Sequence, residues 1–476
     1  MESGSRKMRT GLFIFDTKER GLKEVCAKNG FEVSIYCCGP TVYRDAHVGN
    51  LRTFLLGDLI KRTLTFSGFE SNLIQNITDV GHMAEDIVGN EIGEDKMLAQ
   101  SKAEEIDPFE IARKYEANFH FDLARLNVIP ANSYPKASET IDLMLKLIAE
   151  LIASDHAYLG SDGCVYFSAT SYPSYGEISG NKLDSLQPGY RYEYVEDGAK
   201  KFHADWALWK TAENRTQMIW DSPWGPGFPG WHIECSAMSL HFLEGNVDLH
   251  LGGIDLRFPH HENERAQSNS AVGYEVVENW VHGEHLLFEG RKMSKSAGNV
   301  VLLNDVIANG LDPLSLRLCF LENRYRSQMD LTWESLRAAD ATLDRWRKKM
   351  LQWENDGEID NQFVTDFCEG SLADIKQDLD TPRALQKLRK LEKDELVSGA
   401  TKAACFNSLD AIYGLEFARE PKVKAEATPE IMDLLEKRSS ARAAKDFGQS
   451  DELRDELLKL GISIKDSSAG QDWEWI

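Results

Sequence analysis

The run Gly290-Arg291-Lys292-Met293-Ser294-Lys295-Ser296-Ala297-Gly298-Asn299 decides how the rest of this chain is interpreted. Two lysines stand three residues apart between glycines, on a segment too polar and too aperiodic to belong to a core. Two flexible ammonium groups on a loop hinged by glycine and serine can swing over a triphosphate, and they neutralise the charge that develops when pyrophosphate leaves. Taken alone, the run also fits a solvated surface loop rich in lysine.

A second motif stands far upstream, in the order expected of a nucleotide-binding unit. An apolar run from Ser34 to Cys38 breaks at Gly39-Pro40, and His47-Val48-Gly49-Asn50 then opens an amphipathic stretch. Strand, glycine turn and helix start place a histidine and backbone N–H groups where a nucleotide phosphate can bind, although a histidine before a helix is often only a cap. This motif resembles the His-Ile-Gly-His signature of class I aminoacyl-tRNA synthetases. The lysine run resembles the other signature of the same class. Its fourth position is Asn50, which can donate a hydrogen bond to phosphate but cannot carry positive charge.

Cysteine, histidine and glutamate residues in three separate segments form a candidate metal site. They are Cys38, Cys235, His260 and Glu264. His260 and Glu264 are four residues apart at an expected helix start, so their side chains share one face. Two thiolates, an imidazole and a carboxylate would make a four-ligand zinc site. Spacing alone fits buried structural cysteines as well, because no Cys-x-x-Cys pair occurs.

Along nearly its whole length the chain resembles the cysteinyl-tRNA synthetases. The resemblance is carried by residues 36–43, 76–79, 205–210, 230–238 and 258–264 together with the lysine run, several of them rich in Trp, His and Cys. In that family the zinc ligands fall on Cys38, Cys235, His260 and Glu264, and the metal receives the sulfur of the substrate. Pocket shape alone separates serine from cysteine by only about 1 to 3 kcal/mol, whereas zinc prefers the thiolate. An editing domain is therefore not expected.

The resemblance also implies a two-step reaction and roles for individual residues. The carboxylate of cysteine attacks the α-phosphate of ATP, which magnesium accompanies, and the terminal ribose hydroxyl of tRNA-Cys then attacks the adenylate. The residues assigned to phosphate contact and transition-state stabilisation are His47, Asn50, Lys292 and Lys295. Those assigned to the cysteine pocket and the adenylate are Gly39, Thr41, Thr78, Trp231 and Asp255. Without the family, these five are ordinary turn, core and loop residues.

Composition indicates a large protein of the reducing cytoplasm. The 476 residues, of which 42% are hydrophobic, suffice for two to four domains. The sequence shows no apolar signal region and no apolar run long enough to span a membrane, and its eight cysteines follow no disulfide pattern. With 54 basic against 77 acidic residues, the net charge of -23 repels phosphates at long range. RNA contact is therefore expected at local basic clusters such as residues 337–349 and 383–393, which also fit solvated helix faces.

The expected fold class is α/β. A Rossmann-like class I catalytic core, built on a βαβ unit with strands at Val33–Cys38 and Ser71–Thr78, carries an inserted connective subdomain and is followed by a helical bundle and a small anticodon-side domain. The expected boundaries are 1–125 and 231–335 for the two halves of the core, 126–230 for the insertion, 336–420 for the helical tRNA-binding domain and 421–476 for the anticodon-binding domain. Glu416–Ala427 is linker-like, and the protein is expected to be a monomer.

Two alternative functions remain open on the sequence. The mycothiol-pathway cysteine ligase resembles this family in its zinc site and lysine loop, but it attaches cysteine to an amino sugar and has a shorter helical tail. A paralogue that binds tRNA or cysteine without activating it is suggested only by Asn50. The segment Ala441–Phe447, with Asp451 and Arg454, resembles the anticodon-side tail of the synthetase and favours tRNA as the acceptor.

Overall fold

The computed structural model describes residues 8–27, 30–80, 95–186, 199–213, 215–293, 298–421, 428–460, 462–467 and 470–475. The chain divides into two compact units, residues 1–419 and 420–476, which are described separately below. None of the helices in these described ranges combines the length and the apolar character needed to cross a lipid bilayer.

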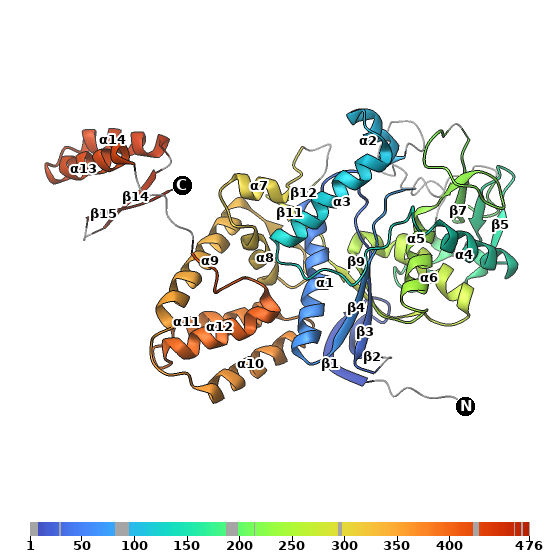
Figure 1. The fold of residues 1–476 in the computed structure, drawn as a ribbon, viewed down its shortest axis with the longest axis horizontal. Helices are drawn as coiled ribbons and strands as arrows, with labels where there is room; N and C mark the ends of the chain where they lie inside the picture. The colour runs from blue at the N-terminus through green and yellow to red at the C-terminus, as the bar shows by residue number, and fades with distance from the viewer. Residues whose placement is uncertain are drawn as a thin grey trace. The chain divides into compact units, whose positions relative to one another are not determined.

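A four-stranded parallel sheet, with strand order β10-β9-β3-β4, forms the centre of the larger unit (Figure 1). Its strands are β3 (Glu32–Cys37), β4 (Glu70–Gln75), β9 (Val247–Gly253) and β10 (Val277–Gly283). In register, Cys37 pairs with Gln75 on one side and with Leu251 on the other. Helix α1 (Val48–Phe66) connects β3 to β4. Because the carboxyl ends of parallel strands meet at one edge, the residues that follow these strands lie close together.

Strand β4 ends three residues earlier than the sequence suggests, and the segment that follows it packs closely against Gly39. A Cβ atom on Gly39 would lie 1.7 Å from the backbone oxygen of Asn76. Beyond Gln75 the two chains continue side by side through a parallel bridge between Thr41 and Thr78. Glycine is therefore required where the chain turns from β3 towards α1, and the turn is held directly against the segment after β4.

The sheet is surrounded by the elements of the insertion, by five helices and by an N-terminal hairpin. The insertion between the sheet halves contains an antiparallel sheet of order β5-β6-β7-β8, comprising β5 (Ala157–Leu159), β6 (Val165–Phe167), β7 (Trp206–Thr211) and β8 (Gly227–Pro229). Helices near the insertion and the sheet are α2 (Lys96–Glu104), α3 (Pro108–Arg125), α4 (Ile141–Ala153), α5 (Trp231–Phe242) and α6 (His260–Val272). An N-terminal hairpin, β1 (Met8–Asp16) and β2 (Gly21–Ala27), was not expected from the sequence.

The lysine run follows directly from a small three-stranded sheet of order β12-β11-β13. Its strands are β11 (Leu286–Phe288), β12 (Arg291–Lys292) and β13 (Met329–Leu331). Leu286 to Phe288 pair in parallel with Met329 to Leu331, so the hairpin that begins the lysine run is fixed to the chain leaving α8 (Pro313–Leu321). A short helix, α7 (Leu303–Ala308), follows the run.

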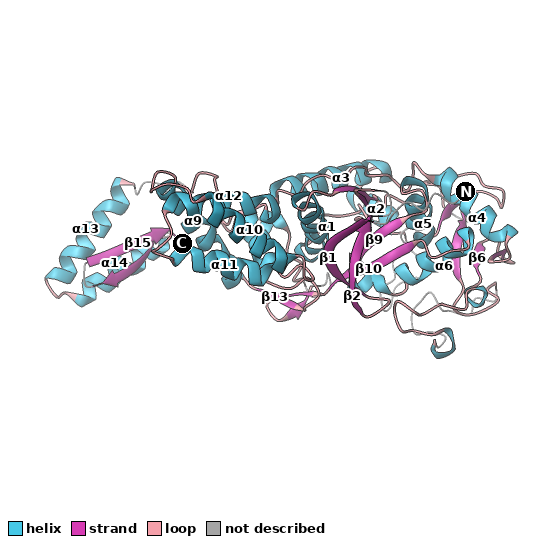
Figure 2. Cartoon of the chain, turned by 90° about the horizontal axis from the view of Figure 1, so that it is seen from below, coloured by secondary structure: helices cyan, strands magenta, loops and turns pink. Residues whose placement is uncertain are grey.

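A helical bundle occupies the C-terminal part of the larger unit, on the opposite side of the sheet from α4, α5 and α6 (Figure 2). It consists of α9 (Trp333–Trp353), α10 (Asn361–Ile375), α11 (Thr381–Lys393) and α12 (Gly399–Tyr413). Several basic residues of the two candidate RNA clusters have acidic partners here: Arg345 and Lys349 pair with Glu392, and Arg383 and Lys387 pair with Asp374. These pairs favour the interpretation of the clusters as internally neutralised helix faces.

The expected linker begins later than the sequence suggests. Leu415 and Phe417 are fully buried in the core of the larger unit, and residues 422–427 lie outside the described part of the chain. The smaller unit contains α13 (Pro429–Ala443), α14 (Phe447–Lys459) and the hairpin β14 (Ile462–Ser467) and β15 (Gly470–Trp475). It has a separate hydrophobic cluster formed by Ile431, Leu434, Leu435, Leu457, Ile462 and Ile464.

A buried carboxylate on α1 connects the central sheet to the helical bundle. Asp58 accepts hydrogen bonds from Arg62 at 2.9 Å, from Arg317 on α8 at 2.5 Å and from the backbone N–H of Ile129 at 2.8 Å. Arg62 and Arg317 also donate to the backbone oxygens of Ala411 and Tyr413 at the end of α12. The two guanidinium groups therefore satisfy both the carboxylate and the free carbonyls of a helix end.

Replacement of Asp58 by alanine should destabilise the protein by about 3 to 5 kcal/mol, because it leaves two buried guanidinium groups without their common counter-charge. Urea denaturation measures this difference directly. Asp366→Ala, which removes an exposed carboxylate from α10, is the matched control and should shift the unfolding free energy by no more than about 0.5 kcal/mol. Equal stability of the two variants would contradict a structural role for the Asp58 cluster.

Candidate active site

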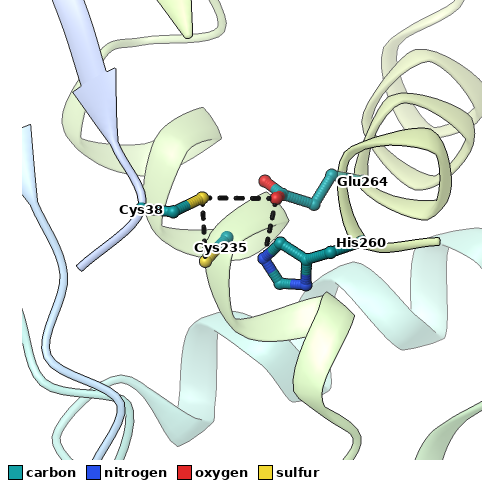
Figure 3. Close-up of side chains that lie close together, drawn as sticks. All are labelled: Cys38, Cys235, His260 and Glu264. Carbon is teal, nitrogen blue, oxygen red and sulfur yellow. Dashed lines mark hydrogen bonds and ion pairs between the residues drawn. The ribbon is translucent and has the colours of Figure 1, made fainter. Parts of the chain in front are cut away.

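Four side chains with metal-ligand chemistry meet beside the carboxyl end of β3. Cys38 follows β3, Cys235 lies on α5, and His260 and Glu264 stand one turn apart at the start of α6. One ligand atom from each lies within 4.8 Å of the others, and Figure 3 shows the four side chains pointing towards one another. Each is at most 4% exposed. The fold thus brings together all four residues for which the sequence suggests zinc binding.

The distances within this cluster fit a tetrahedral metal site. Cys38 Sγ lies 4.0 Å from Cys235 Sγ and 3.6 Å from Glu264 Oε1, whereas His260 Nε2 lies 2.9 Å from Glu264 Oε1. Zinc with two sulfur, one nitrogen and one oxygen ligand would separate such atoms by about 3.4 to 3.8 Å. The sulfur–oxygen distance falls within this range and the sulfur–sulfur distance lies just above it, whereas the shorter histidine–glutamate distance is that of a direct hydrogen bond. The donor set and its spacing therefore fit zinc after a small separation of His260 and Glu264.

Burial and hydrogen bonding shift the pKa values of the two cysteines in opposite directions. Burial raises the pKa of the Cys235 thiol, but hydrogen bonds with Cys38 and His260 outweigh it and lower this pKa to about 7. Burial also raises the pKa of Cys38. His260 bonds through Nδ1 to Nδ1 of His232 at 2.8 Å, which orients its Nε2 towards the cluster. An outer partner of this kind is typical of metal-binding histidines.

A second set of ligand atoms overlaps the first. Cys38 Sγ lies 3.5 Å from His250 Nε2 and 3.3 Å from His261 Nε2, and Glu264 Oε2 lies 3.4 Å from His250 Nε2. Both sets share Cys38 and Glu264. The first set offers two thiolates, which zinc prefers, whereas the second offers one. The sequence contains no separate signal for His250 and His261 as candidate ligands, because neither stands in a spacing that singles it out.

The first of the two synthetase-like motifs forms the start of α1. His47 is the N-cap of α1, and it forms a reciprocal capping box with Asn50: Asn50 N donates to His47 Nδ1 and His47 N donates to Asn50 Oδ1, both at 3.2 Å. Burial lowers the pKa of His47 to about 4, so the ring is neutral at pH 7. Asparagine at the fourth position therefore has a structural use here, as a partner in the cap.

The chain around the lysine run packs directly against this helix start. Val48 N donates to Val301 O at 3.0 Å, and a Cβ atom on Gly49 would lie 3.0 Å from the methyl group of Met293. Lys292 is exposed on β12, and Asn299 Nδ2 donates to its backbone oxygen at 3.0 Å. Lys295 lies outside the described residues. The described flanks of the run, at Met293 and Val301, therefore lie beside the start of α1.

The remaining candidate residues lie either beside the cluster or near the start of α1. Thr41 and Thr78 face each other across their backbone bridge, and Thr78 is buried. Trp231, at the first turn of α5, stacks on His260 with ring centroids 4.2 Å apart. Asp255 is exposed on the short 3-10 helix η4 (Ile254–Arg257) after β9, and its charge opposes the lowering of the His47 pKa. Its carboxylate is therefore close to the helix start.

Two buried polar residues in this region were missed by the sequence analysis. Asn76 lies in the segment after β4 and Glu234 lies on α5 beside Cys235, and both are 0% exposed. Glu234 accepts a hydrogen bond from the Thr78 hydroxyl at 3.0 Å. Both residues belong to segments already quoted for the family resemblance, so a signal was present. Residue type alone did not separate them from structural polar residues.

Comparison with known proteins gives concordant sequence matches over the whole chain. Residues 24–341 match the family described as "tRNA synthetases class I (C) catalytic domain", and residues 424–473 match the "Cysteinyl-tRNA ligase anticodon binding domain". The chain is 40% identical to a cysteine--tRNA ligase of Thermus thermophilus, covering 97% of this chain and 99% of that protein. It is 37% identical to the cysteine--tRNA ligase of Deinococcus radiodurans, with coverage of 99% and 98%.

Among solved structures, the fold resembles a methionyl-tRNA synthetase from Mycobacterium tuberculosis in complex with methionyl-adenylate. The TM-score is 0.58 at 15% sequence identity, and the match covers 80% of this chain and 92% of the other. At this level of identity the match establishes the class I synthetase fold, with its parallel sheet and associated helices.

The lowered pKa of His47 predicts a loss of stability in acid. The unfolded chain takes up a proton at this histidine near pH 6.5, whereas the folded chain resists it until about pH 4. The contribution is therefore complete above pH 6.5 and is lost as the pH falls towards 4. Between pH 7.5 and 5, His47→Asn, which keeps an N-cap residue, should lose about 1 to 2 kcal/mol less unfolding free energy than the wild type. Equal losses in urea denaturation would contradict a buried neutral His47.

Proposed function

The chain belongs to the cysteine–tRNA ligase family of class I synthetases, and from this premise we propose that it selects L-cysteine through a zinc ion held by Cys38, Cys235, His260 and Glu264. The protein activates cysteine with ATP and transfers it to tRNA. The observation that carries the zinc proposal is the convergence of two thiols, an imidazole and a carboxylate from three distant segments into one buried cluster. Without a bound metal ion, the burial of so many ionisable side chains would reduce the free energy of unfolding, because charged groups lose their hydration in the interior.

Zinc in this cluster would supply a soft Lewis acid that binds the substrate as a thiolate and discriminates against the hydroxyl of serine. The protein residues then have the task of orienting the rest of the amino acid. Trp231, stacked on His260, closes the side of the pocket next to the ligands. Thr41 and Thr78, on adjacent segments after β3 and before the insertion, are proposed to bind the amino group or the adenylate, and Gly39 allows their close approach.

ATP is proposed to bind across the start of α1, where its phosphates meet the positive end of the helix dipole. His47 and Asn50 contact the phosphates, with the neutral imidazole acting through hydrogen bonds rather than charge. Lys292 and Lys295 neutralise the charge that develops on the triphosphate, and magnesium accompanies ATP. Asp255, exposed near His47, accepts hydrogen bonds from the ribose hydroxyls. Since neither step requires a covalent bond between enzyme and substrate, the contribution of the protein is positioning and electrostatics.

The tRNA is proposed to bind along the C-terminal half of the chain. The domain scheme assigns the stem-contact region to the end of the catalytic core at residue 335, helical tRNA contacts to residues 336–420 and anticodon contacts to residues 421–476. The match of residues 424–473 to an anticodon-binding family supports the last assignment. A monomer in the reducing cytoplasm completes the proposal, consistent with eight free thiols.

The full-length matches weigh against the two alternative functions. A ligase for amino sugars would have no use for a domain of the anticodon-binding family, whereas this chain matches that family over residues 424–473. The non-catalytic paralogue was suggested only by Asn50, and Asn50 completes the capping box of α1. Cysteine-dependent ATP–pyrophosphate exchange followed by charging of tRNA-Cys tests the function as a whole.

The zinc proposal predicts about one zinc per chain in the purified protein, measured by atomic absorption. Cys235→Ser should lose most of this zinc, because a hydroxyl is a poor ligand for the ion, and cysteine activation should fall with it. Cys37→Ser is the matched control: Cys37 is an adjacent buried cysteine that belongs to neither ligand set, and its thiol accepts from Gln75. Retention of zinc by Cys235→Ser would instead favour the set of Cys38, His250, His261 and Glu264.

The domain proposal predicts that removal of residues 422–476 separates the two reaction steps. The cut lies after Phe417, so the core of the larger unit stays intact, and the smaller unit has its own hydrophobic cluster. Cysteine-dependent exchange should remain within about threefold of the full chain, while charging of tRNA-Cys should fall at least about tenfold through lost RNA contacts. Undiminished charging by the shortened chain would contradict the assignment of residues 421–476.

A further inference from the structure

A chain of hydrogen bonds runs through the site from the turn after β3 to helix α5. The backbone N–H of Gly39 donates to Asn76 Oδ1 at 2.9 Å, Asn76 Nδ2 donates to the Thr78 hydroxyl at 3.1 Å, and this hydroxyl donates to Glu234 Oε2 at 3.0 Å. Asn76, Thr78 and Glu234 are each at most 2% exposed. We call this chain of hydrogen bonds, from Gly39 through Asn76 and Thr78 to Glu234, the relay. It lies beside the metal-ligand cluster, because Gly39 follows Cys38 and Glu234 precedes Cys235.

The relay fixes the chemical character of the Thr78 hydroxyl. A hydroxyl has one hydrogen to donate and two lone pairs that accept. Gly39 orients the Asn76 amide, whose NH₂ group then occupies one lone pair of Thr78, and Glu234 takes the only proton. The remaining capacity of Thr78 Oγ1 is therefore a single acceptor position. Without these neighbours the hydroxyl would rotate and could serve a donor or an acceptor equally.

Glu234 has a second feature that a purely structural residue would not need. Its other carboxylate oxygen, Oε1, is buried and has no hydrogen-bond partner among the described residues. Leaving such an oxygen unsatisfied costs stability, and glutamine or an apolar residue would fill the same volume at less cost. Burial raises the pKa of this carboxyl group well above its usual range, and its Oε1 fits a place that receives a hydrogen-bonding group from outside the protein.

We propose that Asn76 and Glu234 are positioning residues that make the Thr78 hydroxyl an acceptor for the α-ammonium group of the substrate cysteine. This inference rests on the proposed function, since it assumes an amino acid with its thiol at the Cys38–Cys235 side. In such a substrate the ammonium group is the strong donor near the thiol, whereas the carboxylate has no hydrogen to donate to the free lone pair of Thr78.

The test uses the full chain and two ligands that differ only in the amino group. Cysteine is compared with 3-mercaptopropionate, which lacks the amino group and is measured as an inhibitor of cysteine-dependent ATP–pyrophosphate exchange. The variants are Thr78→Val, which removes the hydroxyl at constant shape, Glu234→Leu, which removes the acceptor, and Glu234→Gln, which retains an acceptor oxygen. Ser239→Ala, a buried hydroxyl on α5 that bonds only to the Ser236 carbonyl among the described residues, is the matched control.

Thr78→Val and Glu234→Leu should weaken cysteine binding at least about tenfold while changing the inhibition constant of 3-mercaptopropionate less than about threefold. Glu234→Gln should recover most of the loss, and Ser239→Ala should behave as the wild type. Zinc content and the KM for ATP, measured on the same preparations, should stay unchanged. Should Glu234→Leu not fold, Glu234→Ala, which adds no bulk to α5, carries the same comparison.

Equal weakening of both ligands, or a Glu234→Gln variant as impaired as Glu234→Leu, would overturn the positioning role while leaving the proposed function intact. A wild-type chain without cysteine-dependent exchange would overturn the proposed function itself. The two failures are therefore distinguishable in one set of measurements.

Discussion

The burial of an almost wholly polar helix is the constraint on which the rest of this structure depends. Residues 260–269 of α6 are all buried, although their sequence, His-His-Glu-Asn-Glu-Arg-Ala-Gln-Ser-Asn, contains a single apolar residue. Buried polar groups must find partners, so this helix dictates what surrounds it. His260 and Glu264 face the cysteines, while Asn263 accepts from Tyr175 and Arg265 pairs with Glu177 and Glu275. The insertion is thereby fixed to the same helix that supplies two candidate metal ligands.

Part of the site follows directly from strand topology and could be predicted from the sequence. The apolar run ending at Cys38, the glycine turn and the helix start at His47 indicate a βαβ unit, whose strand ends meet at one edge. The assignment of Cys38, Cys235, His260 and Glu264 to one site depended on the family resemblance, because their spacing also fits buried cysteines. The fold adds the independent fact that these four side chains converge.

Other parts depend on contacts between distant segments and could not be predicted. Glu234 and Asn76 lie more than one hundred residues apart in the chain, and only the packing of α5 against the segment after β4 joins them through Thr78.

The partners of basic residues could not be predicted either, since a sequence shows their charge but not the groups they contact. Arg347 looked like part of an RNA-binding cluster, yet it is buried and bonds to Asp312 and to the backbone oxygen of Leu415. Whether a basic residue is available to contact RNA therefore depends on its ion pairs in the fold and not on its residue type alone.

Helix α1 connects the candidate phosphate site to the helical bundle. Its start carries His47 and Asn50, its second turn carries Arg52, and a later turn carries Asp58. Arg52 is buried and donates to four backbone oxygens, those of Glu284, His285, Arg324 and Ser327, in the segments that lead into the parallel strands β11 and β13. Asp58 accepts from Arg317, which also donates to the backbone oxygen of Tyr413 at the end of α12. Arg62 donates directly to the backbone oxygen of Ala411 on the same helix. Buried charge-assisted hydrogen bonds therefore join α1 both to the segments before β11 and β13 and to the end of α12. The helix that caps the proposed phosphate site is thus also the element through which the bundle is held to the catalytic sheet.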